Sequence, residues 1–230
     1  MAASRDDVRR NLDVITAGVA AAADRAGRDP AEITVVAAAK TVPPEPVAWA
    51  IEAGVTAVGE NYVQELRDAR AALEGPHVRW HYIGTLASGT AHHVADLSDV
   101  VETVAGERAA RRLAGRAARA GRVLDVLIEV DLTEERSGVP ERDVDPFVEL
   151  LSSLDGVQVR GLMTLPPLPA TPEDSRPWFA RLRGLRERLR EKHPEVLDLS
   201  MGMSLDYGVA VEEGATMVRI GTALFGPRTS

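Results

Sequence analysis

Short apolar runs rich in Val, Ile, Leu and Ala recur along the chain, and amphipathic segments separate them. Runs of this length between turn-forming residues are typical of buried β-strands. Eight of them predict strands, at residues 34–39, 55–59, 78–83, 100–104, 123–130, 157–163, 197–200 and 217–220. Because strands and helices alternate throughout, the pattern predicts a parallel sheet with helical crossovers.

Two amphipathic helices stand out between and before these runs. The first covers residues 6–25 and precedes the first predicted strand. The second covers residues 177–192 and has one apolar face, made of Trp178, Phe179, Leu182, Leu185 and Leu189. Ser175 is the predicted N-cap of this second helix, and Pro177 suits its first turn.

The number and spacing of the units predict the fold. Eight strand–helix units fill the 230 residues, which favours a closed TIM-type (β/α)8 barrel over an open sheet. We therefore predict an α/β protein with a single domain over residues 1–230 and an extra N-terminal helix. The Pro-rich residues 165–172 fall where a long loop after a strand belongs, and they are too short and stiff for an interdomain linker.

Composition narrows the function classes. Hydrophobic residues make up 45% and charged residues 27% of the chain, as in globular proteins, and no apolar run is long enough for a transmembrane helix. The net charge of −8 and the aromatic content of 4% argue against nucleic-acid binding. Cysteine is absent and the charged N-terminus shows no signal peptide, so we expect a cytoplasmic protein that binds neither nucleic acid nor membrane.

Lysine is scarce in this chain, which uses arginine for nearly every positive charge. Of the 27 cationic residues, only Lys40 and Lys192 are lysines. Lys192 lies at a predicted helix end, whereas Lys40 follows the apolar residues 33–39. A lysine amine can lose its proton and attack a carbonyl, which a guanidinium cannot do. Lys40 is therefore a candidate for covalent chemistry; the alternative is a side chain that merely extends from the barrel rim to water.

Polar residues follow the predicted strands at the ends where barrels of this type carry their active sites. Those expected at one mouth of the barrel are Lys40, Glu60, Asn61, His81, Ser200, Arg219, Gly221 and Thr222. Residues 200–204 and 219–222 combine glycines with hydroxyl side chains, and the loops after the last two strands of a barrel often bind phosphate. The alternative is that these residues only cap helices and form turns.

A lysine amine opposite a phosphate loop suggests pyridoxal 5'-phosphate (PLP), because the aldehyde of PLP reacts with a neutral amine. Arg219 would be the third part of such a site. Placed at the pyridine nitrogen, a guanidinium would keep that nitrogen unprotonated and weaken the ring as an electron sink. The alternative for Arg219 is an ion pair with Glu129 or Asp131.

One acidic stretch is a weaker candidate for chemistry. Glu129, Asp131, Glu134 and Glu135 lie after the fifth predicted strand, where a divalent ion is conceivable. A solvated loop is the better interpretation, and we predict no metal site.

Six motifs in this order resemble the YggS/PROSC family of PLP homeostasis proteins over nearly the whole chain. They are residues 36–41, 59–65, 81–84, 161–163, 200–204 and 218–226, which read VAAAKT, GENYVQE, HYIG, GLM, SMGMS and VRIGTALFG. The resemblance implies a single barrel like that of alanine racemase, of PLP fold type III, with the cofactor on Lys40.

The same resemblance implies the other cofactor contacts. Phosphate contacts would come from Ser200, Gly221 and Thr222, and Arg219 would lie near the ring nitrogen. The predicted cofactor-binding set is completed by Asn61, His81, Met163 and Met201.

Two segments depart from the pattern of the family. Residues 85–90 lack the amide and the lysine that are usual there, and Asp131 and Arg136 stand where the family commonly has asparagine and lysine. Lysines that could act as secondary PLP acceptors are missing as well, so we do not expect PLP to pass between lysines. These departures leave Lys40 unaffected.

The expected function is to hold PLP as a Schiff base and to take part in intracellular PLP homeostasis without catalytic turnover. Apo forms of PLP-dependent enzymes are the candidate partners, and we expect a monomer. One alternative is an alanine-type racemase that uses the same lysine. Racemisation needs an acid and a base on opposite faces of the substrate. Resemblance to the racemases implies that the second base is a tyrosine of a C-terminal β-domain, and we expect no such domain because residue 230 follows the last predicted strand closely. Another alternative is a barrel that binds a different phosphorylated metabolite.

Overall fold

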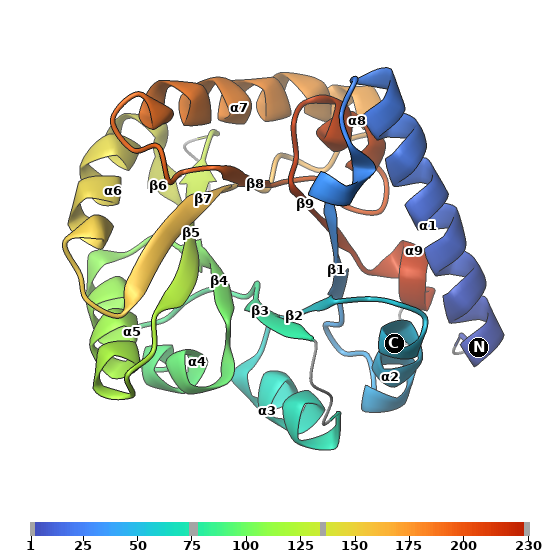
Figure 1. Ribbon diagram of the computed structural model, residues 1–230, viewed down its shortest axis with the longest axis horizontal. Coiled ribbons are helices and arrows are strands. Elements are labelled where there is room, and N and C mark those ends of the chain that lie inside the picture. The colour runs from blue at the N-terminus through green and yellow to red at the C-terminus, as the bar shows by residue number, and fades with distance from the viewer. Residues whose placement is uncertain (1–2, 74–77, 134–136, 228–230) are drawn as a thin grey trace.

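A ring of eight parallel strands forms the centre of the molecule, with the helices around it (Figure 1). The computed structural model describes residues 3–73, 78–133 and 137–227. The barrel strands are β1 Thr34–Ala38, β2 Ala57–Glu60, β3 Arg79–Tyr82, β4 Val100–Val104, β5 Leu124–Asp131, β7 Val157–Met163, β8 Asp198–Ser200 and β9 Met217–Ile220. The predicted (β/α)8 barrel is thus confirmed.

Strand pairing closes the ring. β1 pairs in parallel with β2 on one side and β9 on the other, and β4 pairs with β5. Each predicted run overlaps one of these strands, and β2 and β5 each extend one residue beyond their runs, to Glu60 and Asp131. The second run was placed slightly early, because the N–H of Val55 still donates to Ala50 at the end of the preceding helix. A two-residue strand was not predicted: β6 Val139–Pro140 pairs with the end of β5.

The helices and 3₁₀ segments surround the barrel. The helices are α1 Arg5–Arg25, α2 Pro44–Glu52, α3 Val63–Ala72, α4 Ala91–Leu97, α5 Glu107–Arg119, α6 Val144–Ser152, α7 Arg176–Arg190, α8 Tyr207–Glu212 and α9 Thr222–Phe225, and the 3₁₀ segments are η1 Pro30–Glu32, η2 Glu141–Asp143 and η3 Pro172–Ser175. The extra N-terminal helix, α1, packs against α2, α8 and α9. No helix in the described part of the chain is long and apolar enough to cross a membrane.

The start of α7 differs from the prediction. Thr171 and Asp174 form a capping box that begins η3, which runs directly into α7. Ser175 makes no capping hydrogen bond; it is buried, and its hydroxyl donates to Oδ2 of Asp206 at 2.6 Å. Ser175 therefore joins the helix to the loop after β8. The Pro-rich residues 165–172 follow β7 as a long loop, as predicted, and lead into η3 at Pro172.

The apolar core has two parts. The larger part fills the space between the barrel and its helices. The smaller part lies inside the barrel, where alternate residues of each strand point inward, and consists of Val36, Ala57, Val100, Leu127, Met163 and Met217. Glu102 and Arg219 lie two residues beyond Val100 and Met217 on the same strands, so a polar layer follows this apolar one.

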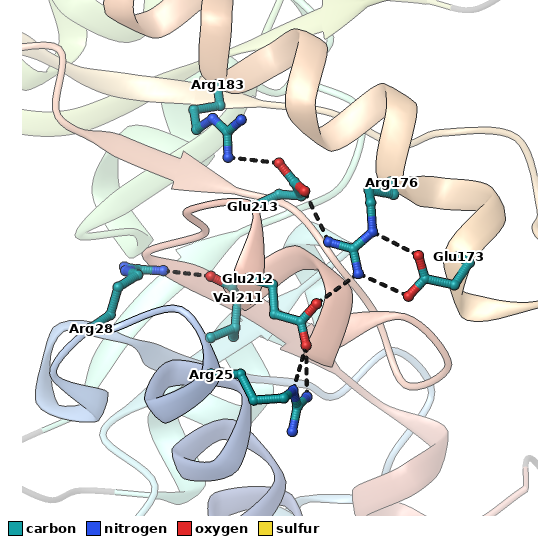
Figure 2. A network of polar contacts seen from close by, with 8 residues as sticks. All are labelled: Arg25, Arg28, Glu173, Arg176, Arg183, Val211, Glu212 and Glu213. Carbon is teal, nitrogen blue, oxygen red and sulfur yellow. Dashed lines mark hydrogen bonds and ion pairs between the residues drawn. The ribbon is translucent and has the colours of Figure 1, made fainter.

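A network of arginines and glutamates ties three surface elements together (Figure 2). Arg176 at the start of α7 donates to Glu173, Glu212 and Glu213, at 2.6–2.9 Å. Arg25 of α1 also donates to Glu212, at 2.8 Å. The network thus links α1, α7 and α8, and α8 directly follows the loop at residues 201–206.

Candidate functional site

A pocket of about 400 Å³ opens where the barrel strands end. Its size falls in the range of small-molecule sites, and its place is where barrels of this kind carry their active sites. Six predicted cofactor-binding residues line it, namely Lys40, Asn61, Met163, Arg219, Gly221 and Thr222. Residues from both ends of the sequence therefore meet at one mouth, as predicted.

Lys40 stands in a tight turn directly after β1. The N–H of Val42 donates to the carbonyl of Ala39 at 2.7 Å, and Thr41 has a φ of 62°. This combination is that of a type II turn, in which glycine usually takes the third position because φ is positive there. A β-branched threonine is strained in this conformation. In the pocket, Nζ of Lys40 lies 5.5 Å from the centre of the Tyr62 ring.

Behind Arg219 a chain of hydrogen bonds crosses the inside of the barrel. Nη1 of Arg219 donates to Oγ of Ser200, and Nη2 donates to the carbonyl of Thr164 at 2.9 Å. Oγ of Ser200 lies 2.5 Å from Oε2 of Glu102, and Nδ1 of His81 lies 2.6 Å from Oε1 of Glu102. All these side chains are buried, and Glu102 was not among the predicted site residues.

The directions of these hydrogen bonds follow from the chemistry of the groups. A guanidinium can only donate, so Ser200 accepts from Arg219 and gives its single proton to Glu102. Burial opposes ionisation of Glu102, but hydrogen bonding and charge from His81, with Arg219 and Ser200, outweigh it and lower the pKa of Glu102. Glu102 is therefore a carboxylate and accepts the Nδ1–H of His81.

Arg219 is a buried cation that lines the pocket. Burial lowers its pKa, and the negative charges of Glu102, Glu129 and Asp206 oppose that shift. The guanidinium stays protonated, as arginines in proteins do. An ion pair with Glu129 or Asp131 was the predicted alternative. Among the described residues, the carboxylate within ion-pair distance is that of Glu102, whose Oε2 lies 3.8 Å from Nη1.

The loops after β8 and β9 meet at Ser204 and Thr222, which both line the pocket. The N–H of Ala223 donates to Oγ of Ser204 at 3.1 Å. Ser204 accepts in that bond and keeps its own proton for another acceptor. A Cβ at Gly221 would lie 3.1 Å from the carbonyl of Ala38, so glycine allows this loop to approach β1. Hydroxyl donors and close backbone thus face the same space.

Asp206 is the second residue that sequence reasoning missed, and unlike Glu102 it lines the pocket. It is buried, and its Oδ1 accepts the N–H of Met203 at 2.7 Å while Oδ2 accepts the hydroxyl of Ser175. The only signal in the sequence was an acidic residue two positions beyond the SMGMS motif. Its carboxylate fixes the loop after β8 and joins that loop to the start of α7.

Three predicted site residues do not line the pocket. His81 and Ser200 belong to the buried chain around Glu102. Met201 is fully buried in the outer core, and its N–H donates to the carbonyl of Met217. The proton of Ser200 is directed to Glu102, whereas the hydroxyl of Ser204 lines the pocket.

Glu60 ends β2 beside the pocket residue Asn61. Its side chain is almost completely buried, and its Oε2 lacks a hydrogen-bond partner in the described part of the chain. Burial, with the charge and hydrogen bond of Glu65, raises the pKa of Glu60 to about 8. Glu60 is therefore largely a neutral acid at pH 7.

A group of metal-type ligands lies away from the pocket, between α6 and the end of α7. It consists of Asp145, Glu149 and His193. Nζ of Lys192 donates to Oδ2 of Asp145 at 2.7 Å, so a cation already pairs with this group. Two of the acidic residues considered as metal ligands, Glu134 and Glu135, lie outside the described residues. The same holds for Arg136, one of the departures from the family pattern.

Comparison with known proteins agrees with this geometry. The family model for the N-terminal domain of alanine racemase matches residues 10–229. A pyridoxal phosphate homeostasis protein of Aquifex aeolicus is 40% identical over 210 residues, 90% of this chain and 92% of the relative. One of Vibrio alginolyticus is 37% identical over 227 residues, 96% of this chain and 97% of the relative.

Solved structures show the same relationship. PipY of Synechococcus elongatus, solved with PLP bound, is 32% identical with a TM-score of 0.85, covering 95% of this chain and 100% of that protein. Alanine racemase of Clostridium difficile shares the fold, with a TM-score of 0.74 at 16% identity over 98% of this chain and 58% of that protein. From the family match, the curated relatives and the shared barrel, we conclude that the chain belongs to the YggS/PROSC family of pyridoxal phosphate homeostasis proteins.

Proposed function

We propose that this protein binds PLP in the pocket, through a Schiff base with Lys40, and takes part in intracellular PLP homeostasis. The observation that carries the proposal is the arrangement of three groups around one pocket: the amine of Lys40, the guanidinium of Arg219 and the loop of Gly221 and Thr222. The relatives named for PLP homeostasis and the PLP complex of PipY support it.

The donor groups of the pocket fit the chemistry of PLP. The phosphate would be held by Thr222, Ser204 and the backbone at Gly221, and the aldehyde would meet Lys40. Arg219 would face the pyridine nitrogen. Asn61 and Met163 complete the contacts from the sides of the pocket. His81 and Ser200 would not contact PLP directly. Both hydrogen-bond to Glu102, behind the pocket lining.

Covalent retention needs only the lysine. Nζ of Lys40 would form a C=N bond with the aldehyde carbon, with loss of one water molecule. PLP supplies an electron sink to enzymes when its ring nitrogen is protonated. A protonated ring nitrogen would need a hydrogen-bond acceptor beside it. The guanidinium of Arg219 can only donate, so the ring nitrogen would stay unprotonated and accept from it. This pocket is therefore suited to holding the cofactor more than to turning over an amino acid.

The decisive experiment compares the two lysines. Purified protein with added PLP is reduced with borohydride and analysed by peptide mass spectrometry, and its visible absorption is recorded. We expect a pyridoxyl adduct on Lys40, and loss of adduct and colour in Lys40→Ala. Lys192→Ala is the matched control and keeps both. An adduct confined to Lys192, or no adduct on either lysine, would overturn the proposal.

Two finer parts of the function need separate tests. We expect no interconversion of L- and D-alanine; racemisation that disappears in Lys40→Ala would instead support the racemase. We expect the PLP-loaded protein to reactivate an apo PLP-dependent enzyme faster than its own PLP release into buffer allows. Equal rates would argue against direct delivery. Light scattering of the loaded protein, with a monomer expected, tests the oligomeric state.

A further inference from the structure

We propose that Glu102 is a positioning residue for Arg219: through Ser200 it fixes the guanidinium at the pocket and balances its charge there. This inference rests on the proposed binding of PLP. It assigns to β4, which contributes no residue to the pocket lining, a role in recognising the pyridine ring.

The contacts of Glu102 connect three other strands. The residue sits in the middle of β4 with no exposed surface, and each of its oxygens accepts one short hydrogen bond. One comes from His81 of β3, at 2.6 Å, and the other from Ser200 of β8, at 2.5 Å. Ser200 in turn accepts from Arg219 of β9. The carboxylate is thus held from both sides and cannot turn away from Arg219.

Charge balance gives Glu102 its importance. A buried guanidinium without a counter-charge is strongly unfavourable, because it has lost its hydration. The negative groups that act on Arg219 are Glu102, Glu129 and Asp206. Asp206 is bonded to Ser175 and Met203, and Glu102 is the group joined to Arg219 by a hydrogen-bonded bridge.

The bridge also sets the geometry of the guanidinium. Nη1 is taken by Ser200 and Nη2 by the carbonyl of Thr164, at 2.9 Å. With both terminal nitrogens anchored, Arg219 has one orientation toward the pocket. Removing the negative charge of Glu102 weakens one anchor and takes away one of the three negative charges that act on Arg219, so the guanidinium is expected to shift. A ligand group that hydrogen-bonds to Arg219 would sense this shift, whereas the phosphate on the Thr222 side would not.

The test separates recognition of the ring nitrogen from stability. Pyridoxine 5'-phosphate has the pyridine ring and the phosphate but no aldehyde, and benzyl phosphate has no ring nitrogen. Binding of each is measured by calorimetry to wild type, Glu102→Gln and Val101→Ala. Val101 is the neighbouring buried residue on the outer side of β4, so its variant is a matched control for loss of stability.

We expect Glu102→Gln to weaken binding of pyridoxine 5'-phosphate about tenfold, the effect of one lost interaction with a charged group. Binding of benzyl phosphate should change less than about twofold, and Val101→Ala should affect neither. Equal weakening of both probes, or no weakening, would overturn the inference. If the wild type binds neither probe, the proposed function itself fails, which is a distinguishable result.

A second variant covers the case in which Glu102→Gln does not fold. Glu102→Asp keeps the negative charge but shortens the reach to Ser200. It should show the same selective loss for pyridoxine 5'-phosphate. In an Arg219→Lys background the substitution should add no further selectivity, because the group being positioned is gone. An additional selective loss in that background would show that Glu102 acts by another route.

Discussion

The hydroxyl of Ser200 donates its single hydrogen bond to Oε2 of Glu102, at an Oγ–Oε2 distance of 2.5 Å. Ser200 was expected to contact phosphate, yet its position makes it a bridge between Arg219 and Glu102. Ser200→Ala should therefore lower stability and, by breaking the bridge to Arg219, weaken binding of the pyridine ring without removing a phosphate contact. We expect a loss of about 1–3 kcal/mol in the free energy of unfolding, because buried charged groups lose a hydrogen-bond partner. Denaturant unfolding of the protein without PLP measures it.

Thr222→Ala should act on the phosphate contact and leave stability unchanged. Thr222 is exposed in the pocket at the start of α9, so its hydroxyl contributes little to folding. We expect unchanged stability without PLP and weaker retention of PLP, by about 1.5–3 kcal/mol for a hydrogen bond to a charged phosphate. Dialysis followed by absorption spectra measures retention. If Ser200→Ala weakened binding of benzyl phosphate more than Thr222→Ala does, the assignment of the two hydroxyls would have to be exchanged.

The barrel could be predicted because its strands are buried on both faces and appear as apolar runs. Two local features could not. The strand β6 has two residues and contains Pro140, so neither length nor periodicity marks it. The start of α7 depends on Thr171, which caps a 3₁₀ segment four residues earlier than the predicted cap at Ser175.

The pocket could be predicted from polar residues that follow strands, but its buried supports could not. Glu102 lies inside the run VVETV, where a single charge in a mostly apolar strand carries no sign of its partners. Those partners are distant in sequence: His81 is 21 and Ser200 is 98 positions away. Only closure of the barrel brings them together. An isolated charge at an inward position of a strand is the signal that could have been used.

The buried acid Glu60 predicts a pH dependence of stability. Its pKa is raised by burial and by Glu65 to about 8 in the folded protein, from an ordinary value of 4.5. The folded state therefore binds this proton more tightly than the unfolded state does. The corresponding stability is fully present below pH 4.5 and is lost as the pH rises to about 8.

Glu60→Gln should remove this loss, because an amide does not ionise. Relative to wild type, the variant should gain at least about 2 kcal/mol in the free energy of unfolding between about pH 5 and pH 8.5. Urea unfolding at several pH values measures the difference. Glu65→Gln is the companion variant and should reduce the pH dependence only in part. Parallel curves for wild type and Glu60→Gln would contradict the raised pKa.

The strained turn at Thr41 predicts a stabilising substitution. Its φ of 62° suits asparagine better than a β-branched residue. We expect Thr41→Asn to raise the free energy of unfolding by about 0.5–1 kcal/mol and Thr41→Val, which keeps the branch, to leave it unchanged. Thermal unfolding compares the variants. A stabilisation by both would mean that the backbone angle is not the cause.

The network around Arg176 predicts a stability that depends on salt (Figure 2). One guanidinium donates to Glu173, Glu212 and Glu213, and these bonds raise the pKa of Arg176 further above its usual range. A lysine ammonium lacks the planar fork needed to contact three carboxylates at once. We expect Arg176→Lys to lower the free energy of unfolding by about 1 kcal/mol at low salt.

About 1 M salt should remove most of that difference, since the Debye length then falls to about 3 Å. Arg111→Lys is the control, because Arg111 makes a single exposed pair with Glu107 within α5. That variant should differ little from wild type at either salt concentration. A deficit of Arg176→Lys that persists at high salt would show that Arg176 stabilises α7 and α8 through packing of its side chain, and not through its charge.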